Sequence, residues 1–333
     1  MKAHLNRISN SVGNHVKVVA ATLLLSLTST AAPAQEYPSG PIQVLVAFAA
    51  GGGTDTLARL LAPQLSILLG QPVTVQNLPG GGGQVAATAL LRDGATGLAI
   101  LATNEPDLFM TTVFNEPGYK AEDFHTIMVD LYDPRVMLVQ PSSPFATLED
   151  FITEAKAAPG TLTVGTTQGN AQELFAKWLF QELEIDVRLV GYPGGGAAAN
   201  AMIAGDVTAA IGDDFARFNI RDQAKALFVA GENASPRWSE AQTLADAVAA
   251  HGVELPAPDF LARYGVYVIS AAFHDSNPEG YAKLQQALVD AWQSDAFQAY
   301  LDTNGLQDLA RGLPGEELAA TFAGDFEQIA KMK

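Results

Sequence analysis

Four times along this chain, a short run of strand-forming residues leads into a glycine-rich turn and then into a helical pattern. The turns are AAGGGTD (49–55), NLPGGGGQ (77–84), GTTQGNAQ (165–172) and YPGGGA (192–197). Glycine could serve each turn merely by permitting a sharp bend. Parallel strands, however, share one carboxyl edge, where ligands bind, and helix N-termini offer free N–H groups to an anion. Four such turns therefore indicate a shared ligand cleft.

The segments around these turns alternate between strand and helix. Residues 42–48 (IQVLVAF) are apolar and β-branched, and residues 54–69 place a series of leucines on one helical face. Further strands are expected at 73–75, 98–103, 135–140, 162–165, 187–190 and 207–212. This alternation predicts parallel sheets covered by helices. Because 333 residues exceed the usual size of one domain, we predict two α/β domains.

Residues 1–34 have the pattern of a secretory signal peptide. Lys2, Arg7 and Lys17 form a basic region without acidic residues, residues 18–27 (VVAATLLLSL) are apolar, and residues 32–34 (APA) form a small-residue cleavage site. The apolar run is shorter than the roughly 20 residues that a membrane anchor needs. We therefore predict cleavage near Ala34 and export of a soluble chain into the periplasm.

Composition excludes several classes of protein. The chain has 36 acidic and 19 basic residues, hence a net charge of −17, whereas nucleic-acid binding relies on clustered basic residues. It contains no cysteine, which excludes disulfides and thiolate chemistry. No Walker, G-x-S-x-G or H-E-x-x-H motif is present, and the loose dinucleotide pattern at 81–86 recurs at 194–199, so it carries little weight. We predict no cofactor, no metal and no nucleic-acid partner.

Groups that could support catalysis are few. His125, His251 and His274 are far apart in the sequence and are expected at surfaces or interfaces. Asp213 and Asp214 are adjacent at a strand end and could act as paired carboxylates. Adjacent residues point in different directions, however, so we expect one to cap the helix at Phe215 and the other to face the cleft.

Residues 37–83 (YPSGPIQVLVAFAAGGGTDTLARLLAPQLSILLGQPVTVQNLPGGGG) resemble the opening of the solute receptors of tripartite tricarboxylate transporters, the Bug-type periplasmic binding proteins. The resemblance continues more weakly through the rest of the mature chain. It implies a two-domain fold like that of periplasmic binding proteins, with a ligand cleft between domains hinged by crossing strands. Domain 1 would comprise residues 35–136 and 267–333, and domain 2 residues 137–266. No enzymatic activity is implied.

The resemblance and the turns together predict the ligand contacts. In the first turn, the family holds a carboxylate through backbone groups and water. Asp55 would repel such a carboxylate, so we expect it to order its own turn. Phe48 and Tyr192 are expected as apolar walls. The predicted contacts are Phe48, Ala50, Gly51, Gly52, Thr54, Asp55, Gly81, Gly82, Thr103, Thr166, Thr167, Gln168, Asn170, Tyr192, Gly194 and Asp213.

Departures from the family pattern affect the identity of the ligand. Where the family has a serine and a histidine in the 165–173 region, this chain has Ala171 and Glu173. Glu173 is expected either to point away along its helix or to oppose a ligand carboxylate. Arg217 and Arg221 are spaced i, i+4, so either they form a solvated helix face or one of them reaches the cleft and pairs with a second carboxylate.

The sequence predicts a monomeric periplasmic receptor that captures an aliphatic or aromatic mono- or dicarboxylate and delivers it to subunits of a membrane permease. Two alternatives stay open. One is an exported partner that binds the same ligand and reports to a sensor. The other is an enzyme that acts on an anionic metabolite with Asp213 or Glu173 as acid or base.

Overall fold

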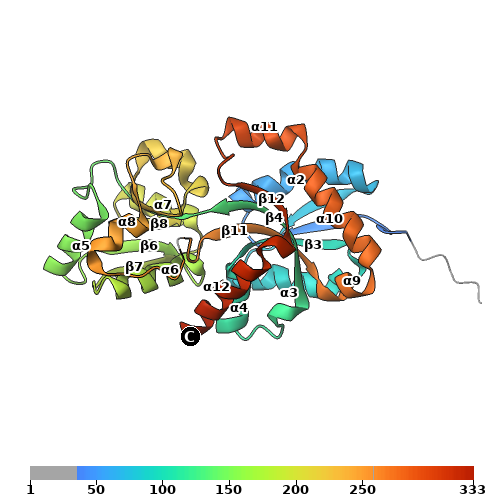
Figure 1. The fold of residues 1–333 in the computed structure, drawn as a ribbon, viewed down its shortest axis with the longest axis horizontal. Coiled ribbons are helices and arrows are strands. Elements are labelled where there is room, and N and C mark those ends of the chain that lie inside the picture. The colour runs from blue at the N-terminus through green and yellow to red at the C-terminus, as the bar shows by residue number, and fades with distance from the viewer. Residues whose placement is uncertain (1–35, 258) are drawn as a thin grey trace, which may run out of the picture. The chain divides into compact units, whose positions relative to one another are not determined.

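The computed structural model describes residues 36–257 and 259–333, so the predicted signal peptide lies outside the described residues. Residues 40–333 form one compact unit that contains two six-stranded sheets, and Figure 1 shows helices flanking the strands of each sheet. No helix within the described ranges has the length and apolar character needed to cross a bilayer.

The first sheet combines the N-terminal strands with strands from later in the chain. Its order is β12 (Ala310–Pro314), β4 (Phe124–Asp133), β11 (Arg263–Ser270), β3 (Ala99–Glu105), β1 (Ile42–Val46) and β2 (Val73–Asn77). Strands β2, β1 and β3 are parallel, whereas β11 is antiparallel to both of its neighbours. Its helices are α2 (Gly53–Leu69), α3 (Gln84–Asp93), α4 (Asp107–Phe114), α9 (Ala271–Ser276), α10 (Pro278–Trp292) and α11 (Asp295–Thr303).

The second sheet has the same mixed character. Its order is β10 (Gln242–Thr243), β9 (Lys225–Ala230), β5 (Arg135–Val139), β8 (Ala209–Asp213), β6 (Thr163–Thr167) and β7 (Arg188–Tyr192). Strand β5 runs antiparallel to β8 and β9. Its helices are α5 (Leu148–Ala157), α6 (Ala171–Glu182), α7 (Gly195–Ala204) and α8 (Leu244–Val248). Two α/β sheets are therefore confirmed. The expectation of parallel strands holds for β2, β1 and β3 and for β7, β6 and β8, but β5 and β11 are antiparallel to their neighbours, because a strand's periodicity does not encode its direction.

The chain passes between the sheets through two short segments. Pro134 alone separates β4 of the first sheet from β5 of the second, and β11 of the first sheet begins directly after Ala262. The domain boundaries predicted after residues 136 and 266 fall inside β5 and β11. An apolar strand pattern shows where a strand lies in the sequence, but not which sheet it joins. The exact positions of the domain boundaries stay a prediction.

The four glycine-rich turns lie where the sequence analysis expects them. Helices α2 and α7 begin within a few residues of the ends of β1 and β7, and α3 and α6 follow β2 and β6. Leu57, Leu61 and Leu65 of α2 are fully buried at the spacing of one helical face. Burial of such faces against the parallel strands holds each turn at the carboxyl edge of its sheet.

The C-terminal helix α12 (Ala319–Lys331) packs across elements of both sheets. Phe326 meets the ring of Phe109 on α4, with centroids 5.7 Å apart, and Phe322 meets Tyr264 of β11 at 5.5 Å. Ile329 belongs to the apolar core built on the second sheet. This packing brings the carboxyl group of Asp325 into a partly buried site.

Asp325 is expected to make the stability of the protein depend on pH. Burial and the nearby Asp259 raise its pKa from 3.8 to about 7, while Arg135 opposes the rise. A carboxyl group whose pKa is higher in the folded than in the unfolded chain destabilises the fold when ionised, so stability falls as pH rises towards that folded pKa. Asp325→Asn should therefore raise the free energy of unfolding by about 1–2 kcal/mol at pH 8, and by less at pH 5.

Urea unfolding at the two pH values measures this difference. The matched control is Glu327→Gln, on an exposed position of the same helix, which should leave stability nearly unchanged. Equal gains from Asp325→Asn at pH 5 and pH 8 would contradict the assignment.

Candidate functional site

A cleft of about 440 Å³ lies at the carboxyl edges of both sheets. The turn after β1 contributes residues 48–54, the turn after β7 contributes residues 193–196, and Asp213 stands at the end of β8. Side chains of β3, β5 and β11 also line it, together with residues of the 3₁₀ helix 215–223. The volume suits a small organic molecule.

The helix N-termini at this cleft differ in how they are capped. Helix α6 is capped by Asn170, whose side-chain oxygen accepts hydrogen bonds from the N–H groups of Gln172 and Glu173 at 3.0 and 3.4 Å. Helices α2 and α7 have glycine at the N-cap, Gly52 and Gly194, and neither has a side-chain cap. The first-turn N–H groups of α2 and α7 thus lack the partner that a capping side chain supplies. Such groups can bind an anion.

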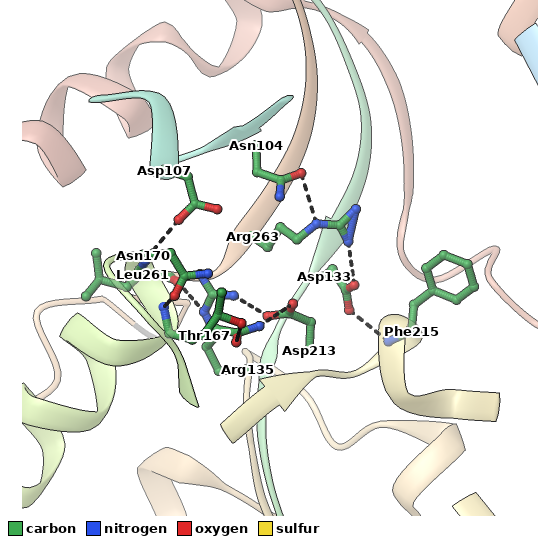
Figure 2. Close-up of polar contacts among 12 residues, drawn as sticks. Asn104, Asp107, Asp133, Arg135, Thr167, Asn170, Asp213, Phe215, Leu261 and Arg263 are labelled. Atoms are coloured by element: carbon green, nitrogen blue, oxygen red, sulfur yellow. Dashed lines mark hydrogen bonds and ion pairs between the residues drawn. The ribbon is translucent and has the colours of Figure 1, made fainter. Parts of the chain in front are cut away.

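Arg135 and Asp213 form the centre of the polar network on the second sheet (Figure 2). Arg135, only 1% exposed, donates through Nη1 to Asp213 and through Nε to the carbonyl of Leu261 at 2.7 Å. The other carboxylate oxygen of Asp213 accepts a 2.8 Å bond from Nε2 of Gln172, whose Oε1 accepts from Thr167 at 2.7 Å. Nη2 of Arg135 is buried without a hydrogen-bond partner.

Arg263 occupies a similar position on the first sheet. It is 3% exposed and donates through Nε to Asn104 at 3.1 Å and through Nη1 to Asp133 at 2.7 Å (Figure 2). Nη2 is buried and unpartnered. A Cβ atom at Gly53 would lie 3.7 Å from this Nη2, so the guanidinium group sits beside the N-terminus of α2. Burial raises the pKa of Asp133 to about 6, with Arg263 opposing the rise.

Asp213 and Asp214 face different surroundings. Asp213 lines the cleft, as expected for one of the pair. Asp214 is fully buried and binds Arg237 through both of its oxygens at 2.6 and 2.8 Å. The expectation that one aspartate of this pair caps the helix at Phe215 is wrong, because the Phe215 N–H donates at 2.8 Å to Asp133 instead. The cap therefore comes from β4, which only the tertiary fold brings nearby.

The arrangement is suited to the binding of an anion. Three guanidinium groups, those of Arg135, Arg217 and Arg263, line the cleft. Asp213 has both oxygens engaged by cationic or amide donors, so neither is free to move a proton. In the described parts of the chain, no three His, Asp or Glu side chains are grouped to hold a metal ion.

Residues 57–313 match the family described as "Tripartite tricarboxylate transporter family receptor". The chain belongs to this family. Protein BugT of Bordetella pertussis is 28% identical over 93% of this chain and 97% of its own length. This receptor thus aligns with BugT over nearly the whole of both proteins, and the family members are solute-binding receptors.

Solved structures share the fold of this receptor at lower sequence identity. Rpa4515 of R. palustris, solved with adipate, is 23% identical with a TM-score of 0.76, over 89% of this chain and 98% of that one. MatC of Rhodopseudomonas palustris, solved with bound malate, is 20% identical with a TM-score of 0.74, over 89% and 99%. The fold of a two-domain periplasmic solute-binding protein is thereby confirmed.

The receptor brings many of the sequence-predicted contacts together in the cleft. The predicted contacts found in the cleft all come from the glycine-rich turns or from strand ends. The residues that line it are Phe48, Ala50, Gly51, Gly52, Thr54, Thr167, Asn170, Gly194 and Asp213. Their roles in binding stay predictions.

Other predicted contacts lie outside the cleft lining, for local reasons. Asp55 is turned into its own loop, where it accepts the N–H of Gly51 at 2.8 Å and pairs with Arg59 at 3.0 Å. This is the turn-ordering role expected for it, and it also occupies the Gly51 amide. Gly81 lines a separate groove beside α3, and a Cβ at Gly82 would lie 3.4 Å from the Gly169 carbonyl.

Of the remaining predicted contacts, Thr103, Thr166 and Tyr192 face the sheet cores, whereas Gln168 is exposed. Thr103 and Thr166 are fully buried, since strand alternation turns them away from the cleft that Asn104 and Thr167 line. Tyr192 packs partly buried against the core of the second sheet and is not a cleft wall. Gln168 lies against Gly191 on the neighbouring strand.

Several residues that line the cleft are not among the contacts predicted from the sequence. The sequence predicts Arg135 only as part of the strand at 135–140, and Arg263, Asn104 and Asp107 are not among the predicted contacts. Asn104 and Asp107 lie at the end of β3 and at the start of α4, a helix that was not predicted. Burial raises the pKa of Asp107, with Arg135 opposing the rise. A charged residue inside an apolar strand run, such as Arg135 in RVMLVQ, is the one signal that could have indicated them.

Glu173 does not oppose a ligand carboxylate. Its side chain accepts the Gly169 N–H at 2.7 Å and pairs with Lys177 at 2.5 Å, and it lines a separate groove between α4 and α6. Burial would raise its pKa, but these donors outweigh burial and lower it. The first of the two orientations expected for Glu173 is thus observed.

Proposed function

We propose that this receptor is exported to the periplasm, captures a small organic carboxylate in the cleft as a monomer, and delivers it to a tripartite tricarboxylate-type membrane permease. The observation that carries the proposal is the convergence on one cleft of two uncapped helix N-termini and three arginine side chains. Both kinds of donor stabilise a carboxylate by charge-assisted hydrogen bonds.

The similar structures support the ligand class. Rpa4515 and MatC were solved with adipate and malate, which are organic carboxylates. At 20–23% identity they share the fold, so the contacts in this chain are argued from its own residues. A carboxylate on either an aliphatic or an aromatic body fits a cleft whose apolar wall includes Phe48.

Export and delivery have separate tests. N-terminal sequencing of protein recovered from the periplasmic fraction should begin near Gln35, and recovery of the uncleaved chain from the cytoplasm would contradict export. Vesicles containing the cognate permease should accumulate labelled ligand only when the receptor is present. Uptake that is independent of the receptor would argue against delivery.

Carboxylates should raise the thermal stability of the receptor, and their amides should not. A ligand at about 100 times its Kd adds about 2.7 kcal/mol to native stability. A thermal-shift screen of aliphatic and aromatic acids, each paired with its neutral primary amide, isolates the contribution of the charge. Equal stabilisation by acids and amides, or none by any acid, would contradict the proposed ligand class.

A further inference from the structure

The cleft contains two matching arrangements of a helix N-terminus and a guanidinium group. At the first sheet, Nη2 of Arg263 lies beside Gly53 at the start of α2. At the second sheet, Nη2 of Arg217 lies so close to Gly195, at the start of α7, that a Cβ atom there would be 2.4 Å away. Each half of the cleft therefore offers backbone N–H groups and an arginine to the same space.

Two glycines make room for Arg217. Besides the contact at Gly195, a Cβ atom at Gly212 would lie 2.6 Å from Cγ of Arg217. Neither glycine has a positive φ, so neither is required by the backbone conformation. Their lack of a side chain instead lets the arginine lie over β8 and the start of α7.

Arg217 also differs from its neighbours in its pairing. Arg135 and Arg263 each bind one aspartate directly, whereas no hydrogen bond or ion pair joins Arg217 to another described residue, and its Nε is buried without a partner. Nη2 of Arg135, on the same half of the cleft, is likewise buried and unpartnered. Unpaired buried guanidinium donors are costly unless an acceptor reaches them.

We propose that Arg217 and the N-terminus of α7 form a second anionic subsite, so that the receptor selects dicarboxylates over monocarboxylates. This inference rests on the proposed carboxylate-binding function. One carboxylate lies at the α2 end beside Arg263, and the second lies at the α7 end, where Arg217 and Nη2 of Arg135 supply the donors. Arg217 is then the specificity-determining residue.

The first test compares Arg217→Gln with the matched control Arg221→Gln. Arg221 follows in the same 3₁₀ helix, but its side chain is 56% exposed and lies over the ring of Phe218. Calorimetry would use succinate, glutarate and adipate, each against the monocarboxylate of equal length. Arg217→Gln should weaken dicarboxylate binding by about 10- to 100-fold and leave the monocarboxylates within about threefold, since a charged hydrogen bond is lost only by the former.

The second test moves the arginine without removing its charge. Gly195→Ala places a methyl group against Nη2 of Arg217, whereas Gly324→Ala, in α12 and outside the cleft lining, meets nothing within 4 Å. Alanine is well tolerated in a helix, so both variants should fold. Gly195→Ala should lower the preference for dicarboxylates, and Gly324→Ala should preserve it.

The outcomes separate this inference from the proposed function. Equal binding of both ligand classes by the unmodified receptor, or an equal loss of both in Arg217→Gln, would overturn the second subsite and leave a carboxylate receptor. The same preference for dicarboxylates in Gly195→Ala and Gly324→Ala would overturn the role given to the position of Arg217. Binding of neither class would overturn the proposed ligand class as well.

Discussion

Gly53→Val is expected to abolish ligand binding while the receptor stays folded. A Cβ atom at this position would lie 3.7 Å from both Nη2 of Arg263 and the ring of Phe215, so the two methyl groups of valine would fill the space between them. The guanidinium and backbone donors at the α2 end of the cleft would then no longer be available to a ligand carboxylate. Since each charged hydrogen bond contributes about 1.5–3 kcal/mol, loss of two should weaken binding by at least about 100-fold.

Gly324→Val, at an exposed position of α12 outside the cleft lining, is the matched control for this variant. A Cβ atom at Gly324 would meet nothing within 4 Å. Calorimetry should show affinity close to that of the unmodified receptor, and thermal unfolding should confirm that both variants fold. Unchanged affinity in a folded Gly53→Val variant would remove the α2 end from the binding site.

Arg237→Ala is expected to cause a large loss of stability. Arg237 binds the fully buried Asp214 through Nε and Nη2, and binds Asp308 and the Gly305 carbonyl through Nη1 at 2.8 and 2.7 Å. These bonds join the turn after β8 to the segment between α11 and β12. Removing one partner of a buried ion pair leaves an uncompensated charge, which costs about 3–5 kcal/mol.

Urea unfolding of Arg237→Ala should be compared with that of Arg311→Ala. Arg311 lies nearby, with its guanidinium 4.8 Å from the centroid of the Tyr132 ring, and its removal should cost only about 0.5–1 kcal/mol. Adding Asp214→Asn to an Arg237→Met variant should recover part of the stability, because the unpaired charge is removed. A loss below about 1 kcal/mol in Arg237→Ala would show that Asp214 is solvated or otherwise compensated.

The first turn illustrates what short-range patterns can predict. Residues 49–55 were expected to follow a strand and open a helix, and Gly52 and Gly53 do so at the cleft. Asp55 was expected to order its own turn, and it binds Gly51 and Arg59. These features depend on residues within about one helical turn of one another, so the local sequence carries them.

The charged groups of the cleft show where such patterns stop. Arg263 lies on a strand inserted antiparallel between β3 and β4, and Arg135 follows the single residue that leads into the second sheet. Arg263 is 130 residues away in sequence from its partner Asp133, and Arg135 is 78 residues away from its partner Asp213. Local hydrophobic periodicity does not predict which strands become neighbours in a sheet.

Arg217 shows the difference between what local sequence patterns predict and what depends on tertiary packing. The sequence by itself determined that the chain builds two α/β sheets with glycine-rich turns at helix N-termini, because hydrophobic periodicity and turn chemistry are local. It left open whether Arg217 faces solvent or the cleft. Only the tertiary structure decided this, because Gly195 and Gly212 come from different elements and make space for the arginine only when α7 packs against β8.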